Sequence, residues 1–485
     1  MAHGLHVDGV TRPGSGEAAL LVDPATGDIV DTVSQASAAE VTAAVDAAAA
    51  AFPGWAARTP GERARVLLRL ADLLEDDAEA LTDLEVAETG KPVAVFRDGE
   101  LPFAADNLRF FAGSARSLEG TGAGSFSAGY TSMLVRRPLG VVAGIAPWNF
   151  PLVMAVWKIG PALAAGNTIV LKPAPSTPRS AIRLAELAAR AGLPAGVLNV
   201  VTGGADVGQA LVHDRRVAMV SVTGSPGAGR AVMESAATST KRVHLELGGK
   251  APALVFGDAD LQAAATALTM AATYNSGQDC TAATRAYVHT SVADRLTGLL
   301  AEQMGRVRVG HPREEATDIG PLVSTGHRDR VHGFVTRAVA AGATLRAGGV
   351  LPEGPGAYYP PTLLTGAAQD AEIVQDEVFG PVLVLGTFET EDEAVALAND
   401  SAYGLASSIW TTDVATALRV APRIQAGVTW VNDHLPIASE APHGGVKGSG
   451  FGKDMSHEAV LEYTVTQHVM IKHALRQAHD SFRPA

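Results

Sequence analysis

The feature that most constrains the fold is a regular alternation of short apolar strands and helices between residues 140 and 248. Because a helix follows each strand, the chain crosses over between neighbouring strands, which predicts a parallel sheet with helices on both faces. Ligands of such sheets bind beyond the carboxyl ends of the strands. The strands are expected at 141–146, 168–173, 197–201, 217–224 and 244–247, and the helices at 151–166, 177–192, 205–213 and from 225 onward.

Two of these helices have recognisable ends. Gly166 is expected to close the helix 151–166. Thr177 is expected to cap the next helix, with Pro178 at its first position, where a missing backbone N–H costs nothing.

A second alternating region, from about residue 251 to 431, predicts a second sheet, with strands at 251–256, 286–292, 382–388 and 428–432. The first hundred residues are expected to be mostly helical, with helices at 36–51 and 61–88 that wrap the first domain. Residues 461–473 alternate like an edge strand, and an exposed edge of that length invites pairing with another subunit.

Composition excludes several classes of protein. The formal charge of −13 argues against nucleic acid or an anionic membrane as the main partner. A single cysteine forbids a disulfide framework within the chain, and the N-terminus shows no signal peptide. The most apolar window, 152–171, is too interrupted by polar, Gly and Pro residues to span a membrane. We therefore expect a cytoplasmic protein.

Three polar residues near the predicted strand ends are candidates for chemistry. Cys280 lies in a predicted loop three residues after Gly277; a lone cysteine is usually a small core residue, but it can also be a reactive thiol. Glu246 ends a strand and precedes two glycines that allow a close backbone approach; it is either a surface carboxylate or a general base. Asn149 follows the first strand as a turn or cap residue, or as an amide donor to an oxyanion.

Two further positions suggest an anion or nucleotide site. Gly224 and Ser225 stand at the start of a helix, where free N–H groups favour an anion. The pattern is neither a G-x-G-x-x-G fingerprint nor a Walker loop. Lys172 closes a strand and is either a solvated charge or part of the same site.

Taken together, six motifs resemble the ordered signature set of the NAD(P)-dependent aldehyde dehydrogenase superfamily, and the resemblance covers nearly the whole chain. They are PWNFP (147–151), LKPA (171–174), VTGS (222–225), ELGGK (246–250), GQDC (277–280) and EVFGP (377–381). The resemblance implies an α/β fold with two doubly wound parallel-sheet domains and a small β arm for oligomerisation. The implied parts are a dinucleotide-binding domain (1–120 and 140–248), a catalytic domain (249–448), and an arm with the C-terminal tail (121–139 and 449–485).

The resemblance also implies roles for the catalytic candidates. Cys280 would attack the aldehyde and form a thioester after hydride transfer to NAD. The amide of Asn149 and the backbone N–H of Cys280 would hold the oxyanion. Glu246 would activate the water that hydrolyses the thioester, which argues against an acylating enzyme that uses coenzyme A. A non-catalytic protein on this fold would have no reason to keep all three residues.

By the same resemblance, other residues would bind the cofactor, and no metal ligands are implied. Lys172 would bind the adenosine ribose, Ser225 and its helix N-terminus the pyrophosphate, Glu377 the nicotinamide ribose, and Phe379 would pack near the nicotinamide ring. Pro175 stands where many NAD-preferring members carry a glutamate, which weakens the sequence argument for NAD over NADP; NAD is still favoured, and NADP stays open. The remaining cleft residues would be Ala146, Pro147, Trp148, Gly208, Gln209 and Gly224.

Substrate choice is expected to depend on Asp279, Glu100 and Trp157, because carboxylates with an aromatic face attract a cation. The alternatives are a turn cap, a solvated charge and a core residue. The segments 110–116, 275–285, 440–456 and 461–473 resemble bacterial gamma-aminobutyraldehyde (1-pyrroline) dehydrogenases, and His443 stands where most aldehyde dehydrogenases carry an aromatic residue. This resemblance implies oxidation of 4-aminobutanal to 4-aminobutanoate in putrescine breakdown. Betaine aldehyde, 3-aminopropanal, 4-guanidinobutanal and a broad specificity are alternatives, and a homodimer or homotetramer is implied.

Overall fold

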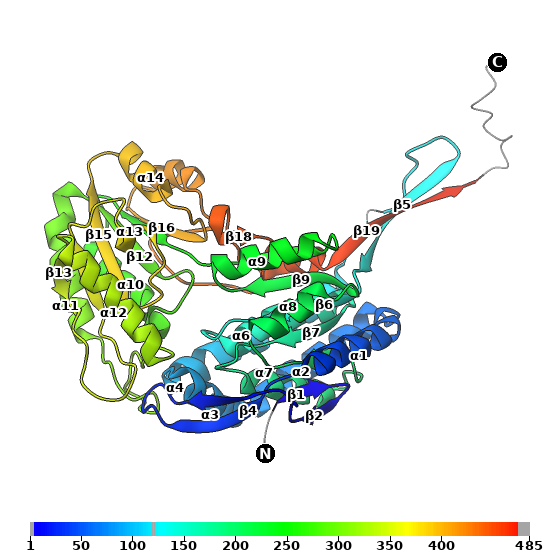
Figure 1. Ribbon diagram of the computed structural model, residues 1–485. Helices are drawn as coiled ribbons and strands as arrows, with labels where there is room; N and C mark the ends of the chain where they lie inside the picture. Colours follow the sequence, from blue (N-terminus) through cyan, green and yellow to red (C-terminus); the bar gives the residue numbers. More distant parts are fainter. Residues whose placement is uncertain (1–3, 119, 121, 474–485) are drawn as a thin grey trace.

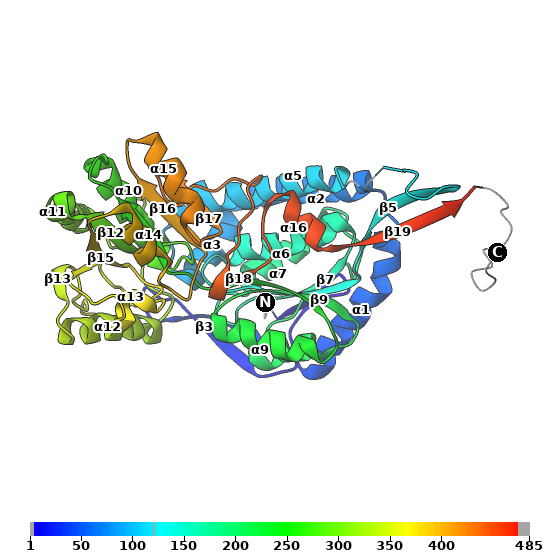
Figure 2. The same ribbon diagram turned by 90° about the horizontal axis from the view of Figure 1, so that it is seen from above.

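The computed structural model describes residues 4–118, 120 and 122–473, so residues 1–3 of the predicted first domain, residues 119 and 121, and residues 474–485 of the predicted tail lie outside it. Two α/β lobes lie side by side, and a two-stranded arm projects from one of them (Figures 1 and 2). Each lobe is built around one sheet. Within the described ranges, no helix combines the length and the apolar character needed to cross a membrane.

The first lobe contains an eight-stranded sheet. Its five central strands are parallel, as the alternation predicted, and antiparallel strands flank them on both sides. One of these flanking strands, β18, comes from the C-terminal segment and pairs with β10, which ties the end of the chain to the first lobe. In sheet order the strands are β18 (Gly450–Phe451), β10 (Arg242–Glu246), β9 (Val217–Thr223), β6 (Val141–Ile145), β7 (Thr168–Lys172), β8 (Leu198–Val200), β1 (Leu5–Val7) and β2 (Val10–Arg12).

Helices cover both faces of this sheet because successive side chains of a strand point to opposite faces. On β6, Val142 faces one apolar core, whereas Val141 and Ala143 face the other. The first core is formed with α2 (Pro60–Asp76), α5 (Leu101–Arg116), α6 (Pro151–Ala165) and α7 (Arg179–Arg190), and the second with α1 (Ala38–Ala56), α8 (Ala205–His213) and α9 (Pro226–Ala237). Burial on both faces explains why these strands are continuously apolar.

The second lobe contains a seven-stranded sheet, parallel except for β13 at one edge. In sheet order its strands are β13 (Thr344–Ala347), β14 (Thr362–Thr365), β15 (Val382–Phe388), β12 (Ala283–His289), β11 (Ala251–Val255), β16 (Ala406–Trp410) and β17 (Val428–Val431). Its helices are α10 (Leu261–Thr273), α11 (Ala293–Arg306), α12 (Thr325–Ala340), α13 (Glu372–Gln375), α14 (Glu391–Asn399) and α15 (Val414–Val420). Thus both predicted alternating regions form sheets of the expected kind.

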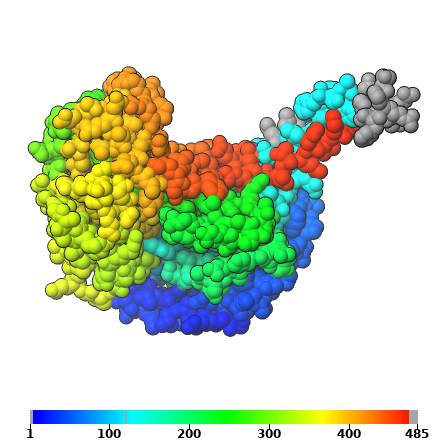
Figure 3. Space-filling view, turned by 45° about the horizontal axis from the view of Figure 1, so that its top comes forward, coloured from blue at the N-terminus to red at the C-terminus, as the bar shows by residue number. Residues whose placement is uncertain are grey.

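The arm consists of β5 (Tyr130–Pro138) and β19 (Thr464–Lys472), paired antiparallel over nine residues each. The predicted edge strand therefore has a partner within its own chain, and it follows helix α16 (Ser456–Glu462). In Figure 3 the arm stands clear of both lobes. Several of its apolar side chains are exposed, among them Val135, Val465, Met470 and Ile471.

The structure differs from the sequence prediction at two helix ends. Helix α7 begins at Arg179, so Pro178 occupies the cap position and the Thr177 hydroxyl has no hydrogen-bond partner. The predicted helix 61–88 is two helices, α2 and α3 (Ala78–Thr89), because Asp77 leaves the helical conformation. The carboxylate of Asp77 binds Arg183 instead of capping α3.

The N-terminal region also differs from the prediction, because it is not only helical. Besides β1 and β2 it contains the hairpin of β3 (Ala18–Val22) and β4 (Ile29–Ser34). After α3 the chain continues through α4 (Val93–Val95) and a π-helical turn, Phe96–Glu100, into α5. The last residue of this turn is Glu100.

Candidate active site

The loop that carries Cys280 is held by backbone geometry that few other residues tolerate. A 3₁₀ turn, Tyr274–Gly277, contains Asn275 and Ser276 at φ of 50° and 58°, in the left-handed region. Gly277 follows at φ 70°, and a Cβ there would lie 2.2 Å from the carbonyl carbon of Gly380. Only glycine fits this position, so the loop keeps one conformation and presents the next residues in a fixed direction.

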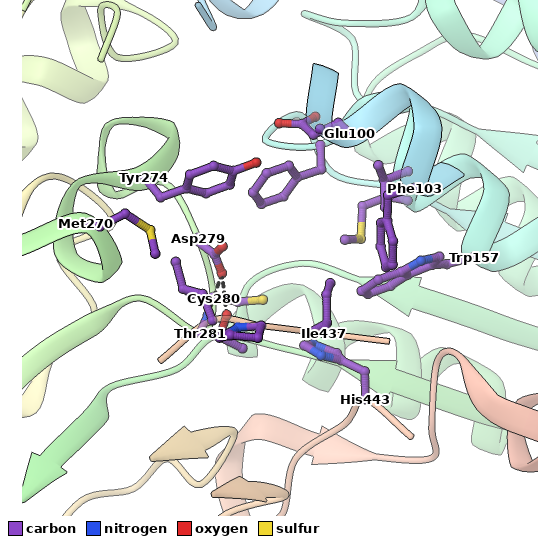
Figure 4. A pocket seen from close by; sticks show the side chains of 16 residues that line it. Glu100, Phe103, Trp157, Met270, Tyr274, Asp279, Cys280, Thr281, Ile437 and His443 are labelled. Atoms are coloured by element: carbon purple, nitrogen blue, oxygen red, sulfur yellow. Dashed lines mark hydrogen bonds between the residues drawn. The ribbon is translucent and has the colours of Figure 1, made fainter. Parts of the chain in front are cut away.

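Cys280 lies where two cavities meet, and each cavity has a volume of about 330 Å³. Cys280 and Met154 are the two residues that line both. Figure 4 shows the sulfur of Cys280 pointing into the first cavity, with Trp157 and His443 across from it. The first cavity is also lined by Gly99, Glu100, Phe103, Phe150, Val153, Met270, Tyr274, Asp279, Thr281, Leu435, Pro436 and Ile437.

Asn149 lies in the wall of the second cavity, in the loop between β6 and α6. Its Nδ2 donates to the carbonyl of Gln278 at 3.0 Å, two residues before Cys280. Its backbone carbonyl accepts from Lys91 Nζ at 3.0 Å and from Asn275 Nδ2 at 2.9 Å. Because a primary amide has two N–H bonds, one remains for a group bound near the sulfur.

Burial raises the pKa of the Cys280 thiol well above its ordinary value. The carboxylates of Asp279, Glu246 and Glu377 raise it further, because a thiolate would repel them. The thiol is therefore neutral at neutral pH, and a nucleophile at this position requires a nearby base or positive charge.

Glu246 lies at the end of β10 and is 3 % exposed. Its side chain lines neither cavity. Oε1 lies against Gly444, at 2.4 Å from the place where a Cβ on that glycine would stand, and neither carboxylate oxygen has a hydrogen-bond partner. Burial, followed by repulsion from Asp454, raises the pKa of Glu246 well above its ordinary value. Of the three predicted catalytic residues, the structure thus brings Cys280 and Asn149 together and holds Glu246 behind them.

The second cavity contains six of the residues predicted to bind a cofactor: Pro147, Trp148, Gly224, Ser225, Glu377 and Phe379. Ser225 caps α9 by accepting from the N–H of Ala228 at 3.2 Å. Glu377 accepts from the N–H of Gly249 at 2.8 Å, and burial raises its pKa to about 7. The rings of Trp148 and Phe379 meet edge to face at 5.3 Å. The cavity thus combines a helix N-terminus, a carboxylate and two aromatic rings.

Five other predicted cofactor residues lie outside the lining of this cavity: Ala146, Lys172, Pro175, Gly208 and Gln209. Lys172 is buried; its Nζ donates to the carbonyls of Pro173 and Gly203, and burial lowers its pKa to about 8. Ala146 is buried beside it and donates its backbone N–H to the carbonyl of Lys172 at 3.0 Å. Pro175 and Gln209 are exposed.

The predicted substrate residues all line the first cavity, but they are held differently. Asp279 Oδ1 accepts from the backbone N–H and the hydroxyl of Thr281, each at 2.7 Å. Glu100 is ion-paired with Lys91, which the sequence did not single out, and its Oε1 has no partner. Trp157 packs 5.0 Å from the ring of His443, and the indole N–H has no acceptor.

A profile of the aldehyde dehydrogenase family matches residues 11–469. The chain belongs to the aldehyde dehydrogenase family. It is similar over its whole length to solved structures of this family. PnpE from Pseudomonas sp. WBC-3 is 39% identical, with all of both chains covered and a TM-score of 0.97. An NAD-dependent aldehyde dehydrogenase from Sinorhizobium meliloti is 40% identical over 99% of this chain and 96% of the other, with a TM-score of 0.97.

A betaine aldehyde dehydrogenase from Staphylococcus aureus, determined in complex with NAD⁺, is 34% identical over 99% of this chain and 96% of the other, with a TM-score of 0.96. PnpE has also been determined in complex with nicotinamide adenine dinucleotide. These similarities establish the two-lobed aldehyde dehydrogenase fold and the dehydrogenase class of the enzyme.

Several residues of this aldehyde dehydrogenase that sequence reasoning missed lie at the site. His327 and Arg330 of α12 line the second cavity, and Lys91 reaches the first from the segment after α3. No local signal marks them, because they reach the site only through the packing of distant helices. The two glycines after Glu246 behave as predicted: a Cβ on Gly248 would lie 2.4 Å from Glu377, and one on Gly249 would lie 2.1 Å from the carbonyl of Cys280.

In the part of the chain that the structure describes, no group of three or more His, Cys, Asp or Glu side chains is arranged to hold a metal ion.

Proposed function

We propose that this aldehyde dehydrogenase oxidises a cationic aldehyde, with 4-aminobutanal as the best candidate, to its carboxylate, and that NAD accepts the hydride. The observation that carries the proposal is the position of Asp279, whose carboxylate lines the first cavity directly beside Cys280. It forms no ion pair among the described residues, whereas the other carboxylate of the cavity, Glu100, is paired with Lys91. Burial raises the pKa of Asp279, and the hydrogen bonds from Thr281 and the charge of Lys91 oppose that rise.

The chemistry follows from the residues at the junction of the two cavities. Once the neutral thiol of Cys280 has passed its proton to a base, the thiolate attacks the aldehyde carbon, and the free N–H of Asn149 and the backbone N–H of Cys280 hold the resulting oxyanion. NAD, when bound, takes the hydride from this carbon. The thioester that remains on Cys280 is hydrolysed by water, for which Glu246 acts as the base.

The residues of the second cavity fit a dinucleotide. The free N–H groups at the start of α9, capped by Ser225, suit a pyrophosphate. The buried carboxylate of Glu377 suits ribose hydroxyls, and Gly248 leaves room where a side chain would collide with Glu377. The NAD complexes of PnpE and of the S. aureus enzyme support the same assignment. The roles of Lys172, Ala146 and Gln209 rest on the sequence resemblance.

NADP is the alternative cofactor because Pro175, which is exposed, supplies no carboxylate to bind ribose hydroxyls. We expect kcat/KM with NAD to exceed kcat/KM with NADP by at least about tenfold. The reverse order would show that the adenosine end of the site accepts a 2′-phosphate.

The first cavity suits a small cation. Its volume of about 330 Å³ lies at the small end of ligand sites. The aromatic faces of Trp157, Phe103 and Tyr274 surround it, and aromatic faces attract ammonium groups. The carboxylate of Asp279 would attract an ammonium and repel the second carboxylate of succinic semialdehyde. Betaine aldehyde, 3-aminopropanal and 4-guanidinobutanal satisfy the same chemistry, and similarity to the S. aureus betaine aldehyde dehydrogenase favours the first of these.

The test is kcat/KM with NAD for 4-aminobutanal (supplied as 1-pyrroline), betaine aldehyde, succinic semialdehyde and hexanal. We expect a cationic aldehyde to exceed hexanal by at least about tenfold, equivalent to about 1.4 kcal/mol of transition-state binding. Preference for succinic semialdehyde or hexanal would refute the cationic substrate and leave the dehydrogenase class intact. A requirement for coenzyme A would instead reveal an acylating enzyme.

We also propose that the arm mediates self-association into a homodimer or homotetramer, because β19 pairs with β5 alone among the described strands and both strands carry exposed apolar side chains. The outer edge of β5 is covered in part by Gly124, which bridges to Ser132. The cytoplasmic location stays a prediction from the single cysteine, and cell fractionation tests it.

A further inference from the structure

A buried polar cluster lies next to Glu246. It consists of His244 on β10, Ser221 on β9, Lys158 on α6 and Asp454 in the segment before α16, all essentially without solvent exposure. Lys158 is ion-paired with Asp454 at 2.7 Å. The cluster uses none of the residues assigned above to the aldehyde or the cofactor.

His244 connects this cluster to Glu246. Its Nε2 lies 3.8 Å from Oε1 of Glu246, a little beyond hydrogen-bond distance, and has no other partner. Its Nδ1 lies 2.7 Å from the hydroxyl of Ser221 and 4.0 Å from Oδ1 of Asp454. The serine hydroxyl can donate to Nδ1 or accept from it; where it donates, the ring carries its proton on Nε2, which faces Glu246.

The charges around Glu246 compensate one another. Lys158 from α6 and Lys453 from the segment before α16 favour its ionised form, whereas Asp454 of that segment and Glu462 from α16 oppose it. Among the described residues, His244 is the one basic side chain within 4.0 Å of a Glu246 carboxylate oxygen. Burial and the two lysines lower the pKa of His244 well below its ordinary value, so the ring acts as a neutral donor.

A general base has to be ionised when it acts, and burial opposes ionisation of Glu246. A hydrogen bond to the ionised form is one of the few effects that restores it. We propose that His244 is a positioning residue for Glu246, and that its Nε2–H closes the 3.8 Å gap to Oε1 to form a hydrogen bond that keeps the carboxylate ionised and oriented for thioester hydrolysis. This inference rests on the proposed function only for the role of Glu246, and it is independent of the charge of the aldehyde.

The test separates the two nitrogens of the ring. Asparagine at position 244 retains a polar atom near Nδ1 and removes the donor near Nε2, whereas glutamine retains a donor near Nε2. The matched control is His6→Asn, because His6 is also buried in the eight-stranded sheet, at 3 % exposure, and its Nδ1 also binds a single hydroxyl, Thr11 at 2.9 Å.

The probe is p-nitrophenyl acetate, which needs no cofactor. Its burst of p-nitrophenol reports acetylation of Cys280, as the ester bond breaks and a thioester forms, and the steady phase reports hydrolysis to acetate and free thiol. For His244→Asn we expect hydrolysis to slow about tenfold, and its acid limb to move up by about one pH unit, at an unchanged burst amplitude. His244→Gln should recover most of both effects, and His6→Asn should show neither. Adding His244→Asn to a Glu246→Gln variant should slow hydrolysis little further, because both changes act through the same carboxylate.

Equal hydrolysis rates and acid limbs in His244→Asn and the wild type would overturn the inference. A His244→Gln variant as impaired as His244→Asn would also overturn it, because a packing role alone would then suffice. Failure of the proposed function looks different: the wild type would show no burst, or Cys280→Ala would retain it.

Discussion

Lys91 is ion-paired with Glu100 in the wall of the first cavity, and its Nζ also donates to the carbonyl of Asn149 at 3.0 Å. The pair therefore joins the wall of the first cavity to the residue that is proposed to hold the oxyanion. Lys91 is completely buried and lies 4.0 Å from a second carboxylate, Glu85. The two carboxylates predicted to recognise an amine thus differ: Asp279 is open to a ligand, and Glu100 already has a cation.

The Asp279→Asn variant should lose selectivity for aminoaldehydes. A charge-assisted contact contributes about 1.5–3 kcal/mol, so KM for 4-aminobutanal should rise about tenfold to a hundredfold. KM for hexanal should change less than about twofold. The control is Glu79→Gln, an exposed carboxylate on α3. Equal effects of Asp279→Asn on both aldehydes would show that Asp279 does not recognise the amine.

Glu100→Gln should affect stability more than selectivity. The change leaves Lys91 buried with only a distant carboxylate, at a cost of about 3 kcal/mol. For a chain of this size, that cost corresponds to a decrease in Tm of about 3 °C in thermal unfolding followed by circular dichroism. The double variant Lys91→Met with Glu100→Met should recover part of this loss. A Glu100→Gln variant with unchanged Tm and a large selectivity loss would assign the amine to Glu100 instead.

Alkylation of Cys280 should be stoichiometric, inactivating and slow at neutral pH. Because the chain has one cysteine, iodoacetamide should label one site, and Cys280→Ala should take no label. The raised pKa of the thiol predicts a rate constant that still rises at pH 9. NAD should change this rate, since its site adjoins the sulfur. Mass spectrometry with activity assays measures both, and full activity after labelling would refute the nucleophile assignment.

His443→Phe should make the enzyme more resistant to acid. Burial lowers the pKa of His443 from 6.5 to about 4 in the folded state. Between these values the unfolded chain binds the extra proton, so the stability that His443 contributes is present above about pH 6.5 and is lost as pH falls towards 4. The free energy of unfolding that His443 contributes changes by about 3 kcal/mol across this pH range.

Buried carboxylates with raised pKa values, such as Glu88 at about 8 and Glu377 at about 7, contribute stability that is lost as pH rises, which is the opposite of His443. The contribution of His443 is therefore measured as the difference in unfolding free energy between the wild type and His443→Phe. Urea unfolding at pH 7.5 and pH 4.5 provides the comparison. An equal stability difference at both pH values would show that His443 titrates normally in the folded enzyme.

Acidic substitutions on the arm should dissociate the enzyme. Val465 and Ile471 lie six residues apart on β19, on one face of the ribbon, and both are partly exposed. Changing both to Asp should yield a monomer in sedimentation velocity, because it places charges in an apolar contact. Val414→Asp, on α15 in the second lobe, is the control because Val414 is 71% exposed. A double variant that sediments like the wild type would remove the arm from the interface.

The two sheets could be predicted from sequence because their strands are buried on both faces. The chain therefore alternates between continuously apolar strands and amphipathic helices, and this alternation is visible in the sequence. The Cys280 loop and the glycines after Glu246 could be predicted because backbone geometry restricts which residues fit there. The predicted cap of α7 was wrong because the Thr177 hydroxyl accepts no backbone N–H and the N–H of Ile182 donates to the carbonyl of Pro178, so the helix starts one residue later than predicted.

The contacts that modify the site could not be predicted in the same way. Glu100 meets Lys91 because a π-helical turn rotates it towards the preceding segment, and no short pattern encodes that turn. His244 meets Asp454 across more than two hundred residues. The sequence resemblance predicts which groups react, whereas the side chains that set their proton affinities depend on tertiary packing.

The placement of Cys280 between two cavities has a consequence for how the enzyme turns over. Under the proposed roles, the aldehyde and the cofactor occupy different cavities, whose shared lining residues are Met154 and Cys280. Enlarging the aldehyde side to admit longer chains should accordingly leave cofactor exchange untouched, which makes that cavity the natural place to redirect this catalyst.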